Sequence, residues 1–247
     1  MFIRKLRWLA AGAIALGANL ATPSQSQADI SIQIQEVDSI GNPIGSSQTF
    51  GPTTLSSLSV PSTSTLSFTV GGITSTLGSG PNAASLTTTM NLGFTSNFAA
   101  NSTDGLEIIV NGTNLTNTSP GAPATFTNNA GASNGLIGNS GNISVSSTST
   151  IDGVTTLPSV ATSGSGIVGG PNTTGNIANL PTPYSILQTI FVYVQPTSNI
   201  NVASTFGGTA STDVITDAVP VPAPGGLALA LIGLPLLGLR RAIRRKV

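Results

Sequence analysis

Apolar and polar residues alternate along several short stretches of this chain, as they do in a β-strand with one buried face. Residues 30–35 read Ile-Ser-Ile-Gln-Ile-Gln, which places isoleucines on one face and polar side chains on the other. The same period of two recurs at residues 66–70 and 86–94. A denser apolar run at residues 186–194 predicts a central strand with both faces covered.

Turn-forming residues separate these runs. They are Gly41-Asn42-Pro43, Gly71-Gly72, Gly80-Pro81-Asn82, Asp104-Gly105, Asn111-Gly112, Asp152-Gly153, Gly169-Gly170-Pro171 and Gly207-Gly208. Short strands with frequent turns predict an all-β fold, and we expect a single sandwich-like domain at residues 29–219 with Gly/Asn/Ser/Thr-rich loops. Apolar residues thin out at 111–183, so we expect long loops there, with Phe126 accessible to chymotrypsin.

Charge is distributed unevenly along the chain. Lys+Arg and Asp+Glu each number 8, but every cation lies within residues 4–7 or 240–246, and every acid lies between these two segments. The body therefore has 8 acids and no cation, and we expect no nucleic-acid binding, because phosphate neutralisation requires Lys or Arg. Cys and His are absent, which excludes disulfides, thiolate or imidazole metal ligands, and Cys or His catalysis.

The first 28 residues have the three parts of a secretory signal peptide. The parts are a basic start (Arg4, Lys5 and Arg7), an alanine-rich apolar run (residues 8–20) and a small-residue cleavage site (Ser26-Gln27-Ala28). We therefore expect signal peptidase to cut after Ala28 and the body to be exported.

The C-terminal end is also divided into parts. Residues 225–239 are fifteen residues without a charged or polar side chain, and a cluster of cations follows them. The cluster consists of Arg240, Arg241, Arg244, Arg245 and Lys246. A transmembrane helix of this length spans roughly 22 Å, which is shorter than the roughly 30 Å core of a bilayer. The positive-inside rule keeps the cluster in the cytoplasm and the body outside, so the cations at both tips define the topology.

This ending resembles the PEP-CTERM sorting tail of exported proteins, which combines a Val-Pro-Glu-Pro-like motif, a short apolar helix and a terminal arginine cluster. The motif here is Val221-Pro222-Ala223-Pro224, with Ala223 where the family usually has Glu. The resemblance covers residues 220–247 and implies processing by an exosortase, a membrane cysteine protease-transpeptidase. An ordinary C-terminal membrane anchor is the alternative, because a short apolar helix with basic flanks is all that such an anchor needs.

Carboxylates are the only common catalytic groups left in the body. The body has no His or Lys to serve as the base of a Ser-His-Asp or Ser-Lys site. It also has no Lys or Arg to bind the phosphate in phosphoryl transfer. A two-carboxylate glycoside hydrolase is therefore the one common enzyme class that remains. Glu36 and Asp38 would lie about 7 Å apart on one strand face, near the spacing of an inverting pair. Both residues fall on the same strand face as the isoleucines, so a continued strand would bury their carboxylates. We therefore expect regular pairing to end or bulge before Glu36, and we expect that the protein is not an enzyme.

Binding chemistry is similarly restricted. Oxygen ligands for calcium occur at residues 104–107 and at Glu36 with Asp38, but the sequence has no EF-hand-like run. The body has no Trp and only Tyr184 and Tyr193, so aromatic platforms for sugars are scarce. Solvated acids without a metal are the simpler interpretation of these carboxylates.

These observations predict a non-enzymatic protein of the cell surface or extracellular matrix, with a structural or adhesive β body and no cofactor. Its expected partners are signal peptidase, an exosortase-type membrane enzyme, the membrane through residues 225–239, and an exopolysaccharide. We expect it to be anchored by the C-terminal helix or released after processing. A calcium- or polysaccharide-binding module and a carboxylate-only glycoside hydrolase are the alternatives.

Overall fold

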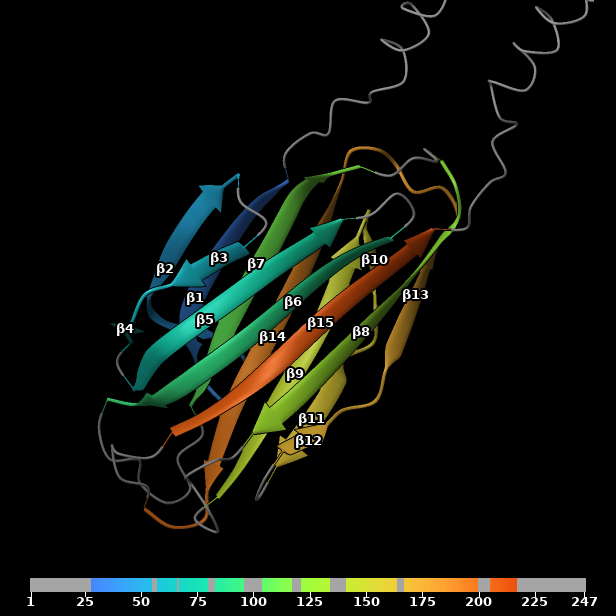
Figure 1. Ribbon diagram of the computed structural model, residues 1–247. Coiled ribbons are helices and arrows are strands. Elements are labelled where there is room, and N and C mark those ends of the chain that lie inside the picture. Colours follow the sequence, from blue (N-terminus) through green and yellow to red (C-terminus); the bar gives the residue numbers. More distant parts are fainter. Residues whose placement is uncertain are drawn as a thin grey trace, which may run out of the picture.

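The computed structural model describes residues 28–54, 57–65, 67–79, 83–95, 104–116, 121–133, 141–163, 167–199 and 205–216. These residues form an all-β structure of two antiparallel sheets packed face to face, a β-sandwich (Figure 1). A search of this part of the chain finds no helix with the length and apolar character needed to cross a bilayer. The predicted signal segment before Ala28 and the predicted sorting tail lie outside the described residues.

The first sheet, sheet A, has seven strands in the order β10-β9-β14-β7-β1-β2, with β11 also paired to β9. Its strands are β1 (Asp29–Val37), β2 (Pro43–Thr53), β7 (Gly105–Leu115), β9 (Gly141–Ile151), β10 (Val154–Thr155), β11 (Ser159–Ser163) and β14 (Tyr184–Pro196). In β1 the predicted alternation is confirmed, because Ile30, Ile32 and Ile34 are buried and the polar residues between them are partly exposed.

The second sheet, sheet B, has eight strands in the order β12-β8-β15-β6-β5-β3, with β13 also paired to β8 and β4 to β5. Its strands are β3 (Ser57–Val60), β4 (Thr63–Ser64), β5 (Phe68–Ser79), β6 (Ala83–Phe94), β8 (Ala124–Ser133), β12 (Ile167–Gly169), β13 (Thr173–Ile177) and β15 (Thr205–Thr216). The strand predicted at residues 86–94 is confirmed within β6, with Leu86, Thr88 and Met90 all facing the core.

A chain of hydrogen-bonded polar side chains crosses the middle of the core between the sheets, and we call it the polar ladder. Its members, all fully buried, are Ser75, Thr88, Asn128, Ser147, Ser149, Gln188 and Thr212. Thr88 Oγ1 of sheet B donates to Gln188 Oε1 of sheet A at 2.9 Å, and Gln188 Nε2 donates to Thr212 Oγ1 of sheet B at 3.0 Å. Ser149 of sheet A contacts Thr212 and donates to Asn128 Oδ1 of sheet B at 3.0 Å.

From Ser75 to Asn128 the hydrogen bonds of the polar ladder run in one direction, and Ser147 donates to the same Asn128 Oδ1. Because Thr88 gives its only hydroxyl proton to Gln188, the 3.0 Å bond between Ser75 and Thr88 is donated by Ser75. Ser149 gives its proton to Asn128, so Thr212 donates to Ser149. Aligned bonds polarise one another in a medium of low dielectric, which strengthens the connection between the two sheets.

The prediction of long loops at residues 111–183 is wrong. The structure places β8, β9, β11 and β13 there, and Phe126 is fully buried in β8 rather than accessible. Many of the inward positions of these strands hold small or hydroxyl-bearing residues, such as Ala130, Ala132 and Ser147, between a smaller number of large apolar side chains. A hydropathy pattern depends on large apolar residues, so it misses strands whose buried face is built from alanine and serine.

The turn predictions are confirmed at two tight connections. Asp152 and Gly153, with φ of 48° and 77°, join β9 to β10, and Gly41 lies in the turn between β1 and β2. Other predicted turns are wrong, because the residues lie inside strands. These are Gly71-Gly72 in β5, Asn111-Gly112 in β7 and Gly207-Gly208 in β15.

The apolar run at residues 186–194 forms β14 at the centre of sheet A, as predicted, but the expectation that both faces are covered is wrong. Its inner face is buried, whereas Leu187 is 36% exposed and Phe191 and Tyr193 are partly exposed on the outer face. The central strand of sheet A therefore presents aromatic side chains on the outside of the sandwich.

β1 begins and β15 ends at the same end of the sandwich, which we call the terminal end (Figure 1). The opposite, distal end contains the β1–β2 turn and the first residues of β7, because Val37 at the end of β1 pairs with Gly105. Any anchor that follows Thr216 would therefore leave from the end opposite the β1–β2 turn.

Replacing Gln188 with Leu keeps the approximate volume of the side chain and removes the centre of the polar ladder. Thr88 and Thr212 each lose a partner inside the core, so we expect the free energy of unfolding to fall by about 1–3 kcal/mol in urea unfolding. Thr189→Val is the matched control, because Thr189 faces outward on the same strand and its replacement should change stability by less than about 0.5 kcal/mol. A Gln188→Leu variant as stable as the wild type would contradict a stabilising role for the ladder.

Candidate binding sites

Glu36, one of the predicted acid candidates, is a buried structural group. It is 2% exposed, and its Oε2 accepts the backbone N–H of Ser67 at 3.0 Å. The expected irregularity is confirmed on one side only: the register of β1 with β2 shifts between Ile34 and Glu36, while the pairing of β1 with β7 continues to Val37. The Glu36 carboxylate thus links sheet A to the segment that precedes β5, and Asp38 does not share its buried position.

Asp38 caps the β1–β2 turn at the distal end. Its Oδ1 accepts the backbone N–H groups of Ile40 and Asn42 at 2.9 and 2.8 Å, and its Oδ2 accepts Asn42 Nδ2 at 2.9 Å. The side-chain and backbone hydrogen bonds from Asn42 hold the pKa of Asp38 below its ordinary value. Asp38 is therefore a fixed anion on the surface at neutral pH.

The predicted calcium candidates at residues 104–107 lie beside this turn. Burial, and then the charge of Glu36, raises the pKa of Asp104, and burial raises the pKa of Glu107. A search of the described residues finds no group of three or more acidic side chains placed to hold a metal ion.

Four side chains at the distal end of sheet A form what we call the aromatic–acidic patch: Asp38, Glu107, Phe191 and Tyr193. Phe191 pairs with Glu107 in the register of β14 and β7. The Phe191 and Tyr193 rings are nearly parallel, with 9° between their planes and 6.1 Å between their centroids. Burial, and then the charges of Asp38 and Glu107, raises the pKa of Tyr193.

A glycine lets the Tyr193 ring lie across the neighbouring strand. Gly105 pairs with Tyr193, and a Cβ at Gly105 would come within 2.6 Å of ring atoms Cδ1 and Cε1. The Tyr193 hydroxyl extends toward the β1–β2 turn, where a Cβ at Gly41 would lie 3.8 Å from it. The ring thus bridges β14 to the turn that carries Asp38.

The sequence prediction named Asp38, Glu107 and Tyr193 separately and missed Phe191. The structure brings these residues together from three parts of the chain: the β1–β2 turn, β7 and β14. A signal for the outward aromatics was present, because Ser185, Thr189 and Gln195 share the parity of Phe191 in β14. Polar residues at that parity indicate a solvent-facing side of the strand.

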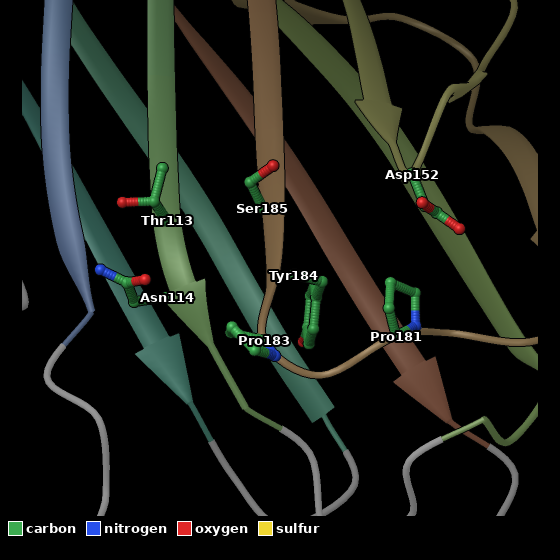
Figure 2. Close-up of a pocket in the computed structure, with 7 residues that line it drawn as sticks. All are labelled: Thr113, Asn114, Asp152, Pro181, Pro183, Tyr184 and Ser185. Carbon is green, nitrogen blue, oxygen red and sulfur yellow. The ribbon is translucent and has the colours of Figure 1, made fainter.

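A second surface feature is a depression of about 300 Å³ at the terminal end of sheet A (Figure 2). It is lined by Thr113 and Asn114 of β7, Tyr184 and Ser185 of β14, Asp152 of the β9–β10 turn, Pro181 and Pro183. Asn114 has a φ of 59° and donates from Nδ2 to Asp29 Oδ2 at 2.8 Å. The left-handed conformation of Asn114 coincides with a register shift between β7 and β14, so it is part of a β-bulge.

Tyr184 is the titratable group that lies deepest in this depression. Its side chain is 6% exposed, and burial raises its pKa to about 12. The phenol therefore stays neutral at physiological pH and serves as a hydrogen-bonding and packing group. The depression adjoins Asp29, because Asp29 pairs with Thr113, and so it lies close to the point where the chain enters the sandwich.

The predicted processing residues lie almost entirely outside the described part of the chain. Ala28, the predicted cleavage residue, is partly buried against the core directly before β1. The motif Val221-Pro222-Ala223-Pro224 and the cluster Arg240, Arg241, Arg244, Arg245 and Lys246 lie outside the described residues.

Comparison with known proteins finds no protein-family model and no curated protein that matches this chain. Function is therefore inferred from the residues of the chain and from their arrangement in space.

Buried Tyr184 should make the stability of the sandwich depend on alkaline pH. The unfolded chain loses the Tyr184 proton near the ordinary pKa of 10.0, whereas the folded chain retains it up to about 12. The free energy of unfolding should therefore fall between these two values, by about 2–3 kcal/mol in total. Urea unfolding across this pH range measures the decline.

The variant Tyr184→Phe should remove most of this decline, because Phe has no proton to release. Tyr193→Phe is the control, since Tyr193 is more exposed and its removal should leave the larger part of the pH dependence. An equally steep decline in Tyr184→Phe would contradict the assignment.

Proposed function

We propose that this chain is an exported, non-enzymatic protein of the cell surface or extracellular matrix with a structural or adhesive role, sorted by an exosortase. One observation carries the proposal: all 8 cations lie in the two tips, and the body between them has none. Cations stop a segment from crossing a membrane, so this distribution is that of a body translocated between two basic stops.

The resemblance of residues 220–247 to a PEP-CTERM sorting tail supports the exosortase step. The apolar run at 225–239 is short for a permanent span and is interrupted by Gly233, Pro235 and Gly238. Such a helix suits a temporary anchor that holds Pro222 and Pro224 within reach of a membrane enzyme.

The placement of the chain ends supports a surface role. β1 begins and β15 ends at the same end of the sandwich, so a tail held in the membrane would direct the distal end away from it (Figure 1). The distal end carries the aromatic–acidic patch. In this position the patch is accessible to extracellular material.

The surface form should begin at Asp29 and lack the tail from about Pro222 onward. N-terminal sequencing and intact mass of the protein from its native host test both ends, with a host lacking exosortase as the control. We expect the shortened C-terminus only in the native host. A native surface form that retains residues 240–247 would contradict sorting and favour the ordinary membrane anchor.

The basic cluster should be needed for efficient processing. Replacing Arg240, Arg241, Arg244, Arg245 and Lys246 with Ser removes the charges that keep the helix in register during its encounter with the enzyme. We expect a larger share of unprocessed precursor on an immunoblot of cell fractions. Replacing the four arginines of the cluster with Lys keeps all five charges and is the control. Equal processing of the Ser and Lys variants would count against this role.

A further inference from the structure

The distal end of sheet A has the features of a carbohydrate-binding surface. We propose that the aromatic–acidic patch binds a polysaccharide that carries free amino sugars. This inference rests on the proposed export, because it assigns a ligand to the adhesive role of the body.

The aromatic side chains provide the surface for sugar rings. Phe191 and Tyr193 are adjacent on the outer face of β14, with nearly parallel rings whose centroids are 6.1 Å apart. An aromatic face carries partial negative charge and packs against the C–H groups of a pyranose ring, which carry partial positive charge. Two neighbouring rings along one strand suit successive sugars of a chain.

The carboxylates determine which sugars fit. Glu107 lies opposite Phe191, and the Tyr193 hydroxyl lies beside Gly41 in the turn that carries Asp38. No Lys or Arg exists anywhere in residues 8–239, so no cation of the body can neutralise these acids. An ammonium group on the ligand supplies the missing charge and donates charge-assisted hydrogen bonds to carboxylates. Acidic polysaccharides are repelled by the same groups.

The two parts of the patch act together on an amino sugar. The ring face of the sugar stacks on Phe191 or Tyr193, and its ammonium group reaches Glu107 or Asp38 at the edge of the rings. Cations are also attracted to aromatic faces, which adds to binding at this position. The patch lies on the outer face of the sheet, so it suits a long chain that runs across the sheet and not a small molecule enclosed in a pocket.

Binding by the full-length chain in detergent tests the proposal without depending on export. The probes are chitosan oligomers, the N-acetylated chitin oligomers of the same backbone, and oligolysine. We expect titration calorimetry at slightly acidic pH to detect chitosan binding that weakens with added salt, because the carboxylates are near the surface. Equal affinity for chitin oligomers, or for oligolysine, would overturn the proposal.

Variants locate the binding on the patch. Phe191→Leu and Tyr193→Leu retain an apolar side chain without the ring, and each should weaken chitosan binding by about tenfold. Glu107→Gln should weaken it by about two- to fivefold and reduce its salt dependence. Leu187→Ala on the same outer face and Asp152→Asn at the terminal end are the matched controls and should leave binding unchanged.

Each outcome bears on one proposal only. Unchanged binding in Tyr193→Leu and Glu107→Gln, both with wild-type unfolding midpoints, would overturn the patch as the site. Glu107→Gln alters a partly exposed residue of the outer face, so it tests the site even if an aromatic variant unfolds. Absence of chitosan binding by a protein that is correctly processed in its host would overturn this inference and leave the proposed export intact.

Discussion

The hydrogen bonds from Gln188 to Thr88 and Thr212 are the interaction on which the rest of the sandwich depends. They join sheet A to two strands of sheet B through fully buried groups. Because an unpaired buried polar group costs about 1–3 kcal/mol, they fix the position of β14 against β6 and β15. A shift of one residue in β14 would exchange its inner and outer faces. Because Gln188 faces the core, Phe191 and Tyr193, which have the opposite parity, lie on the outer face.

The sequence predicts the strands whose buried face is large and apolar. The isoleucines of β1 and the leucines of β6 identified those strands and their inner faces correctly. In β8 and β9 much of the inner face is made of Ala130, Ser147 and similar small residues, whose role depends on partners in the opposite sheet. Such partners are distant in the chain, so residue pattern alone cannot assign them.

The candidate site was predictable only in its parts. Asp38 and Glu107 were identified as exposed acids, but their proximity to Tyr193 depends on the pairing of β14 with β7 and of β7 with β1. Gly105 was interpreted as a turn residue, whereas in the structure it begins β7 and leaves room for the Tyr193 ring. Glu36 lies on the inner face of β1, where it is buried and accepts the backbone N–H of Ser67, so it is not part of the patch.

The sandwich has two different ends: both described chain ends leave from one, and the aromatic–acidic patch occupies the other (Figure 1). An NMR titration of the isotope-labelled protein with a chitosan oligomer tests this division of roles most directly. We expect chemical shift changes centred on Gly105, Glu107 and Tyr193, with none at Thr113, Asn114 or Asp152. Changes centred on the depression at the terminal end, or on the outer face of sheet B, would contradict it.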